Sequence, residues 1–219
     1  IPVICVDGPS ASGKGTLAAA LAASLGYHHL DSGALYRAAA LAARRAGIAD
    51  DDRASLAELA GTLDLRFEGA VTLLDGRDVT DALREEAVGA LASLISAWPE
   101  VRVALRSLQL SFRRVPGLVA DGRDMGTVVF PDATLKVFLT ASAAERAARR
   151  HKQLILKGLS ASIAGLRADL EARDERDQNR VVAPLRPAQD ALLLDNSHLT
   201  IDASAARVLG WWQERRPFG

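Results

Sequence analysis

The stretch that decides the fold is a short apolar run, Val3-Ile4-Cys5-Val6, followed one residue later by Gly8-Pro9-Ser10-Ala11-Ser12-Gly13-Lys14-Gly15-Thr16. The apolar run predicts a buried strand, and the glycine-rich segment has the GxxxxGK spacing of a loop that holds phosphate between a strand and a helix. Successive backbone N–H groups at a helix start concentrate positive potential on a phosphate, and Lys14 can reach the terminal phosphates. We therefore expect Gly8–Thr16 to bind a nucleoside triphosphate.

The end of this loop departs from the usual pattern. Gly15 stands where Ser or Thr is usual, so the hydroxyl that would approach Mg²⁺ is delayed to Thr16. We therefore take Thr16 as a candidate Mg²⁺ ligand. A GKGT ending of this kind suggests a kinase that acts on a small molecule.

Length and composition restrict the class of protein. The chain has 219 residues, 49% of them hydrophobic, which suits one α/β domain with insertions or two small domains. Lys plus Arg number 27, as do Asp plus Glu, so the net charge is zero. The composition therefore gives no sign of nonspecific binding to the backbone of a nucleic acid. The single cysteine, Cys5, lies in the first apolar run and indicates a reduced thiol in a cytosolic protein.

The chain also lacks the sequence signals of a membrane or metalloprotein. No run approaches the ~20 apolar residues that span a bilayer, and no signal-type segment opens the chain. The four histidines, His28, His29, His151 and His198, have no metal-ligand spacing. We expect a cytoplasmic monomer whose partners are small molecules, with no membrane and no nucleic-acid polymer among them.

Short apolar runs alternate with segments of helical periodicity. The runs that predict buried parallel strands are Val3–Val6, Tyr27–Leu30, Leu118–Ala120, Leu135–Leu139 and Leu199–Ile201. The segments that predict helices are Thr16–Leu25, Ala34–Ala46, Glu100–Arg114 and Ala143–Lys157. This alternation implies an α/β fold with a doubly wound, five-stranded parallel sheet in three α/β/α layers. Ligands bind beyond the carboxyl ends of the strands in such sheets.

One stretch breaks this alternation. Leu63–Val79 alternates in polarity, with a turn at Asp75-Gly76, which predicts a small antiparallel β meander. We expect residues 63–83 to be an inserted part of the monophosphate-binding region. Residues 1–62 and 84–219 would then form the phosphate-loop core.

A second candidate anion site follows the second predicted strand. It is the segment Asp31-Ser32-Gly33-Ala34-Leu35-Tyr36-Arg37, which runs into a helix. Asp31 or Ser32 could simply cap that helix. Alternatively, the amides of the helix start, the Ser32 hydroxyl and Arg37 one turn later bind a second phosphate. A kinase with a phosphorylated acceptor needs two phosphate sites, so both interpretations stay open here.

A third cluster of polar residues follows the third strand. Asp121-Gly122-Arg123-Asp124-Met125-Gly126-Thr127 places two carboxylates and a guanidinium where ligands collect, although solvated turn charges would look the same. Asp121 could orient water bound to Mg²⁺, as acidic strand ends do in phosphate-loop enzymes. A near copy, Gly76-Arg77-Asp78, lies in the predicted meander, and for it we favour a structural turn.

Basic residues gather in two helical segments further along the chain. Arg173, Asp177 and Arg180 share one helix face, where a surface salt bridge between Arg173 and Asp177 is the simplest interpretation. The density of arginines up to Pro184 is also suited to gripping the oxygens of a transferred phosphoryl group. The upstream cluster of Arg149, Arg150 and Lys152 completes either a mobile lid near residues 149–170 or a solvated basic face.

The whole pattern resembles the bacterial-type cytidylate kinases, a family of nucleoside monophosphate kinases. The resemblance covers nearly the whole chain and rests on Gly8–Thr16, Asp31–Arg37, Asp121–Ala133, and Arg173–Arg180 followed by Ala183-Pro184-Leu185. The phosphate loop is shared by many kinases, whereas the second and third motifs, with the meander between them, are much more specific. Ala11 is a departure, because related kinases often carry glycine there, and it puts a positive φ at this position in doubt.

The resemblance implies transfer of the γ-phosphoryl group of ATP to CMP or dCMP, with Mg²⁺ and without a covalent intermediate. It implies that the acceptor phosphate is held by Ser32, Arg37, Arg123 and Arg180, the ribose by Arg173 and Asp177, and the base by Ser93, Arg102 and Asp124. Cytosine offers an amino donor, which a carboxylate accepts, and two acceptors, which Arg and Ser satisfy. The catalytic candidates, which hold ATP or neutralise the moving phosphoryl group, are Lys14, Arg123, Arg173 and Arg180.

Two rival functions use the same phosphate loop. A uridylate-preferring or other small-molecule kinase would differ in the acceptor it selects. A nucleotide-switch ATPase would act through a partner protein and would need no monophosphate acceptor. The second anion site and the lid arginines argue against a switch.

Overall fold

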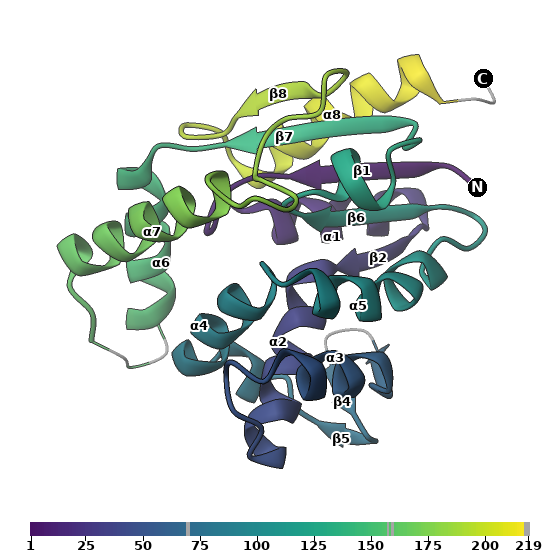
Figure 1. The fold of residues 1–219 in the computed structure, drawn as a ribbon. Coiled ribbons are helices and arrows are strands. Elements are labelled where there is room, and N and C mark those ends of the chain that lie inside the picture. The colour runs from purple at the N-terminus through teal and green to yellow at the C-terminus, as the bar shows by residue number, and fades with distance from the viewer. Residues whose placement is uncertain (69–70, 157, 159, 217–219) are drawn as a thin grey trace. The chain divides into compact units, whose positions relative to one another are not determined.

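The computed structural model describes residues 1–68, 71–156, 158 and 160–216, which form two compact units (Figure 1). The first unit consists of Ile1–Leu30 and Phe112–Gly219, and the second of Asp31–Ser111. The assignment of residues 63–83 to monophosphate binding stays a prediction.

A five-stranded parallel sheet organises the first unit, as predicted. Its strand order is β2-β6-β1-β7-β8. β1 pairs in parallel with β6 and β7, and β7 pairs in parallel with β8. The strands are β1 (Val3–Asp7), β2 (His28–Asp31), β6 (Leu118–Gly122), β7 (Leu135–Thr140) and β8 (Leu192–Asp195). Every residue of β1 and β6 is buried, which is why their sequences read as continuous apolar runs rather than alternating ones.

Different elements pack against the two faces of this sheet. Side chains such as Val6 and Val137 point to one face and form the core with α1 (Lys14–Leu25) and α8 (Ile201–Arg215). Because successive side chains alternate between faces, Asp7 and Lys136 point the other way. On that side lies a π-helical turn, η2 (Met125–Val129), whose backbone is bound by Asp7.

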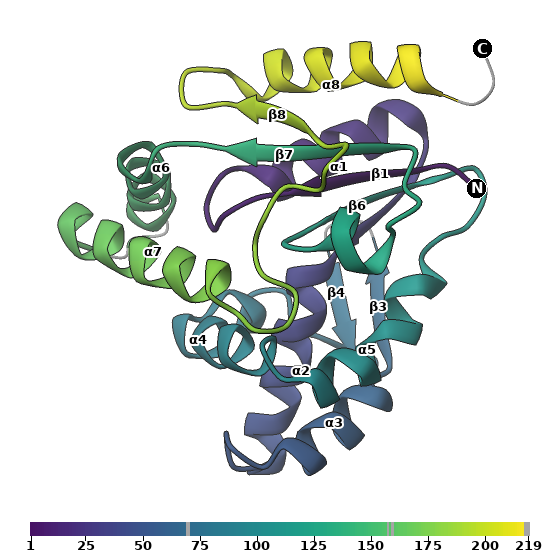
Figure 2. The same ribbon diagram turned by 45° about the horizontal axis from the view of Figure 1, so that its top comes forward.

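Two helices of the first unit lie beyond the carboxyl ends of the strands, α6 (Ala143–Ile155) and α7 (Ile163–Gln178) (Figures 1 and 2). They pack against each other. Ser142 and Ser162 cap them by accepting backbone N–H groups of Glu145 and Gly165. The ends of the strands and these two helices therefore belong to one unit.

The second unit contains four helices and a small antiparallel sheet in its described part. The helices α2 and α4 pack together, as do α3 and α5. The predicted meander is present, in the strand order β3-β4-β5. The elements are α2 (Ser32–Ala46), α3 (Arg53–Gly61), β3 (Leu65–Glu68), β4 (Val71–Leu74), β5 (Arg77–Asp78), the 3₁₀ turn η1 (Ala82–Arg84), α4 (Glu86–Ile95) and α5 (Pro99–Ser111).

Several sequence-based boundaries are wrong. The fifth strand is Leu192–Asp195, not Leu199–Ile201, because Thr200 caps α8 by accepting the Ala203 N–H at 3.1 Å. The apolar residues after Thr200 therefore belong to a helix. The helix predicted over Ala143–Lys157 ends at Ile155, and Lys157 lies outside the described residues. The basic helix ends at Gln178, so Arg180 follows it instead of lying on its face.

No single helix in the described ranges is long and apolar enough to cross a membrane. In the part of the chain that the structure describes, one pair of helices, α4 and α5, passes that test together by length and composition, and the pair is bent by 102° at the break.

Candidate active site

The phosphate loop joins β1 to α1 through residues with left-handed backbone. Gly13, with φ 90°, is the residue before α1, and Ala11 has φ 58°. The doubt about a positive φ at Ala11 was therefore wrong: the loop imposes this conformation, and alanine adopts it at a cost of about 1–2 kcal/mol. The turn is thus built as the motif predicts, although one of its glycines is missing.

Gly8 is required by a close approach of two backbones. A Cβ atom built on Gly8 would lie 2.2 Å from the carbonyl oxygen of Leu139 in β7. No side chain fits there, because real Cβ contacts are never that short. Gly8 therefore lets the loop leave β1 directly beside the carboxyl end of β7.

The carbonyl groups of the loop are bound by side chains from later in the chain. The Ser10 carbonyl accepts from Arg146 Nη1 at 3.0 Å, and the Ser12 carbonyl accepts from Arg149 Nη1 at 3.2 Å and from Asn196 Nδ2 at 2.9 Å. Arg149 also donates to the Asn196 backbone at 2.6 Å. The alternative of a solvated basic face is thus wrong for Arg149, which fixes the loop.

Two side chains of the loop remain suited to phosphate. Lys14 Nζ donates to the Pro9 carbonyl at 3.3 Å, so it already lies over the loop. The Ser12 hydroxyl is buried and has no hydrogen-bond partner within the described structure. Since a buried polar group costs free energy unless it is paired, Ser12 Oγ is a candidate donor to a phosphate oxygen.

The candidate Mg²⁺ residues lie near the start of α1. Asp121 is 3% exposed, and its carboxylate oxygen is 3.8 Å from the position of a Cβ atom on Gly15. His29 Nε2 lies 2.8 Å from the other Asp121 oxygen. Thr16 is exposed in the first turn of α1. Among the described residues no group of three or more His, Cys, Asp or Glu could hold a metal ion.

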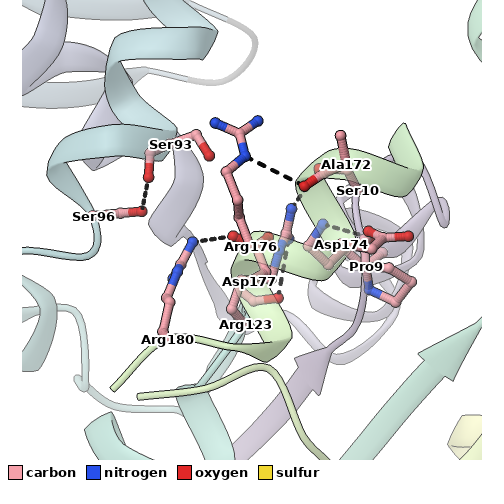
Figure 3. Close-up of polar contacts among 12 residues, drawn as sticks. Pro9, Ser10, Ser93, Ser96, Arg123, Ala172, Asp174, Arg176, Asp177 and Arg180 are labelled. Carbon is pink, nitrogen blue, oxygen red and sulfur yellow. Dashed lines mark hydrogen bonds and ion pairs between the residues drawn. The ribbon is translucent and has the colours of Figure 1, made fainter. Parts of the chain in front are cut away.

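A buried carboxylate joins the predicted arginines of the first unit (Figure 3). Asp177 is 1% exposed, accepts from Arg123 Nε at 2.8 Å and is also bound by Arg180. Arg123 donates in addition to Ser10 Oγ of the phosphate loop at 2.6 Å. Burial opposes ionisation of Asp177, but Arg123, Arg180 and Arg173 outweigh it and lower its pKa. The simple surface salt bridge is therefore the wrong description of this site.

A second buried ion pair connects α6 with α7. Arg146 Nη2 lies 2.5 Å from an oxygen of Asp174, and both side chains are largely buried. Arg146 Nε also donates to the Ala141 carbonyl at 3.0 Å. With its bond to the Ser10 carbonyl, Arg146 links both predicted lid helices to the phosphate loop.

In the second unit the predicted residues contact other residues of the same unit. Asp31 caps α2 by accepting the Ala34 N–H at 3.0 Å, which confirms the capping interpretation, and Ser32 is buried beside it. Arg37 Nη1 donates to the Leu83 carbonyl at 2.8 Å. The assignment of Ser32 and Arg37 to a phosphate stays a prediction.

The predicted base-reading residues of this unit meet at Ser96. Ser93 is buried, and its carbonyl accepts from Ser96 Oγ at 2.9 Å (Figure 3). Arg102 Nη1 donates to the Ser96 carbonyl at 3.2 Å and to Tyr36 Oη at 3.4 Å. Neither is an ordinary residue of a helix surface. The two side chains come from α4 and α5, which the short Ser96–Trp98 connection brings together.

Sequence reasoning missed four residues that shape the site. Asp7, His29, Arg146 and Asn196 all bind candidate site residues or the backbone beside them. Asp7 could have been noticed, because it is an acidic residue directly between a buried strand and the phosphate loop. The partners of the other three are 92 to 184 residues away, and no local pattern indicates them.

Comparison with known proteins adds an independent result. A family model for cytidylate kinase matches residues 4–214. A cytidylate kinase of Burkholderia mallei (strain NCTC 10229) is 59% identical over 97% of this chain and 93% of its own length. One from Paraburkholderia phymatum is 57% identical over 99% of this chain and 95% of its own. A crystal structure from Thermus thermophilus, 23% identical over 97% of both chains, has a TM-score of 0.47, too low to assign a fold.

Proposed function

The chain belongs to the cytidylate kinase family, and we propose that it transfers the γ-phosphoryl group of ATP to CMP or dCMP, giving CDP or dCDP and ADP. One observation supports this most directly. Arg123 joins Ser10 of the phosphate loop to the buried Asp177, which also binds Arg180. Two guanidiniums are thus held by one carboxylate next to the loop, where they could neutralise charge on a transferred phosphoryl group.

ATP would be held by the loop Gly8–Thr16. Its carbonyl groups at Ser10 and Ser12 already have donors, which leaves the backbone N–H groups and the Ser12 hydroxyl to face a phosphate. Lys14 would move from the Pro9 carbonyl to a phosphate oxygen. The loop therefore offers backbone donors whose positions are set before ATP arrives.

Mg²⁺ would be held by the Thr16 hydroxyl and by Asp121, directly or through water. Hydroxyl and carboxylate oxygens are hard ligands of the kind Mg²⁺ prefers, and Mg²⁺ usually keeps several waters and phosphate oxygens. The absence of a larger acidic cluster in the described part of the chain suits such a site. When bound, Mg²⁺ neutralises charge on the phosphates. His29 would hold the Asp121 carboxylate in one orientation.

The acceptor CMP has its own set of assigned residues. Ser32, Arg37, Arg123 and Arg180 are assigned to its phosphate, and Arg173 and Asp177 to its ribose. Cytosine would be read by Ser93, Arg102 and Asp124. Asp124 is buried, which makes a hydrogen bond from the cytosine amino group selective, because uracil presents a carbonyl oxygen there instead.

An acceptor panel tests the proposal. ADP release would be measured by a coupled assay with ATP and Mg²⁺, using CMP, dCMP, UMP, AMP or no acceptor. We expect CMP and dCMP to be phosphorylated well above UMP and AMP, and little ADP without an acceptor. Equal rates with all four monophosphates would contradict the base assignment, and ADP formation without acceptor would favour a nucleotide switch. The comparisons give no support to either rival function.

We also propose that the enzyme acts as a monomer in the cytoplasm, where both nucleotides are available. The arginines that neutralise the phosphoryl group all come from one chain, so a second copy is not needed to complete the site. Sedimentation at assay concentration would test the monomer.

A further inference from the structure

Asp7 is a buried carboxylate that the assigned roles leave unused. It ends β1, directly before Gly8, and is 5% exposed. Its oxygen Oδ1 accepts the Met125 N–H at 2.8 Å, and Oδ2 accepts the Gly126 N–H at 2.8 Å. Each oxygen therefore binds one backbone donor of a segment 118 or more residues away in the sequence.

Those two donors are the first N–H groups of the turn η2, Met125–Val129. The first N–H groups of a helical turn have no partner within it and need a cap. The residue before the turn is Asp124, whose side chain would normally provide the cap. Asp124 makes no such bond, although its carbonyl accepts from Val128 at 2.9 Å. Asp7 thus takes over the capping role from a neighbouring strand.

The turn η2 packs closely against the strands beside it. A Cβ atom on Gly126 would lie 3.4 Å from Asp7 Oδ2 and 3.1 Å from the side chain of Lys136, so the turn lies tightly against β1 and β7. In the first unit, the loop that begins with Arg123 and Asp124 is therefore fixed to the strand that carries the phosphate loop.

We propose that Asp7 is a positioning residue for base selection: by capping η2, it fixes the backbone of Asp124–Gly126 and with it the position from which Asp124 would meet the cytosine amino group. The inference rests on the proposed function, in which Asp124 reads the base. Asp7 itself touches no substrate in this scheme. Its effect is transmitted through the backbone of Asp124–Gly126.

Protonation of Asp7 would disturb its two hydrogen bonds to the Met125 and Gly126 N–H groups. Burial raises its pKa to about 7 and nearby Asp124 adds to this, while the Gly126 and Met125 N–H groups and Arg123 oppose it. Cys5 on the same strand and Lys136 on β7 also lie near it. A protonated Asp7 has one oxygen that donates, so it can no longer accept from both N–H groups.

The test compares Asp7→Asn with Cys5→Ala, a matched control on the same strand and the same face, also buried. The ratio of kcat/KM for CMP to that for UMP is measured at pH 8, together with the KM for ATP. An asparagine can accept only one of the two N–H bonds. We expect the CMP/UMP ratio to fall roughly tenfold to a hundredfold in Asp7→Asn, since small misplacements have effects of that size. The KM for ATP should stay within about twofold, and Cys5→Ala should keep both values.

Two further measurements identify the route of the effect. In an Asp124→Asn background, adding Asp7→Asn should cause no further loss of the CMP/UMP ratio. In the wild-type enzyme the ratio should fall between pH 8 and pH 6, a readout that does not depend on a variant folding. The acceptor phosphates of CMP and UMP titrate alike and cancel in the ratio.

The outcomes separate the two proposals. A wild-type enzyme that does not prefer CMP would overturn the proposed function. A wild-type preference that is unchanged by both Asp7→Asn and pH, or lost equally in Cys5→Ala, would overturn only the role of Asp7. Additive losses in the double variant would also overturn it, because Asp7 would then act without Asp124.

Discussion

Replacing Asp177 by asparagine tests whether one buried carboxylate holds the arginine cluster together. The side chain keeps its shape but loses the charge that binds Arg123 and Arg180. Both guanidiniums are mostly buried, with side-chain exposures of 15% and 8%. Both would therefore remain mostly removed from water in the variant, which retains two positive charges without their carboxylate partner.

The magnitude follows from this burial. Removing one partner of a buried ion pair costs about 3–5 kcal/mol, because it leaves an uncompensated charge. Arg123 retains its bond to Ser10 Oγ, which reduces the loss. We therefore expect Asp177→Asn to lower the free energy of unfolding by about 3 kcal/mol at pH 7.

The pH dependence has a definite sign. The pKa of Asp177 is lower in the folded state, since the arginines outweigh the effect of burial. Its contribution to stability is thus fully present above its unfolded pKa of about 4, and is lost as pH falls through the folded value. The difference between wild type and Asp177→Asn should be constant from pH 5 to 8 and shrink below about pH 4.

Urea unfolding at pH 7 measures the effect, with Asp64→Asn as the control. Asp64 also pairs with an arginine, Arg66 at 3.1 Å, but both side chains are more than half exposed. Exposed pairs contribute about 0–1 kcal/mol, so this variant should change little. The reasoning is refuted if Asp177→Asn loses less than about 1 kcal/mol, or no more than the control.

Three other variants test the remaining parts of the site. Asp124→Asn should reduce discrimination between CMP and UMP by roughly 1–3 kcal/mol, measured as the ratio of kcat/KM values, and an unchanged ratio would count against Asp124 as the base reader. Gly8→Ala places a Cβ atom 2.2 Å from the Leu139 carbonyl oxygen, so the loop must move by about 1 Å. We expect the KM for ATP to rise on the order of tenfold or more. An unchanged KM would show that the loop adapts without losing ATP binding. Because the folded pKa of Asp7 is raised to about 7, the folded state binds the extra proton between about pH 4 and 7, and stability falls as pH rises through that window. The unfolding free energy of wild type minus that of Asp7→Asn should therefore decrease by roughly 4 kcal/mol across it, whereas a flat difference would mean that Asp7 is ionised throughout.

The elements that the sequence predicts well are those with local signals. Fully buried strands such as β1 appear as apolar runs, and the phosphate loop has a fixed spacing of glycines and lysine. The fifth strand was misplaced because two short apolar segments, Leu192–Asp195 and Leu199–Ile201, look alike in isolation. The two segments differ in the cap that Thr200 provides to α8. Because a helix begins at this cap, the apolar residue that follows it belongs to a helix and not to a strand.

In the candidate site, too, local sequence patterns identify residues but do not predict the contacts between residues far apart in the chain. Residue types and spacing point to Arg123 and Asp177 as charged residues near the ligand. Their mutual contact, and the contact of Arg123 with Ser10, depend on a topology that joins segments 54 and 113 residues apart. The carbonyl groups of the loop present the same difficulty, because the donors that bind them come from α6 and from the segment after β8.

These distant contacts bring two guanidiniums together beside the phosphate loop in a chain of zero net charge. Arg123 and Arg180 are held together by the Asp177 carboxylate, which balances part of their charge. In the proposed function, a phosphate beside the loop would meet guanidiniums that are already largely buried and oriented. Because the cost of burying these arginines is met on folding, more of their interaction with a phosphoryl group would be available to stabilise the transition state. On this proposal Asp177 would matter to the chemistry through the arginines that it positions.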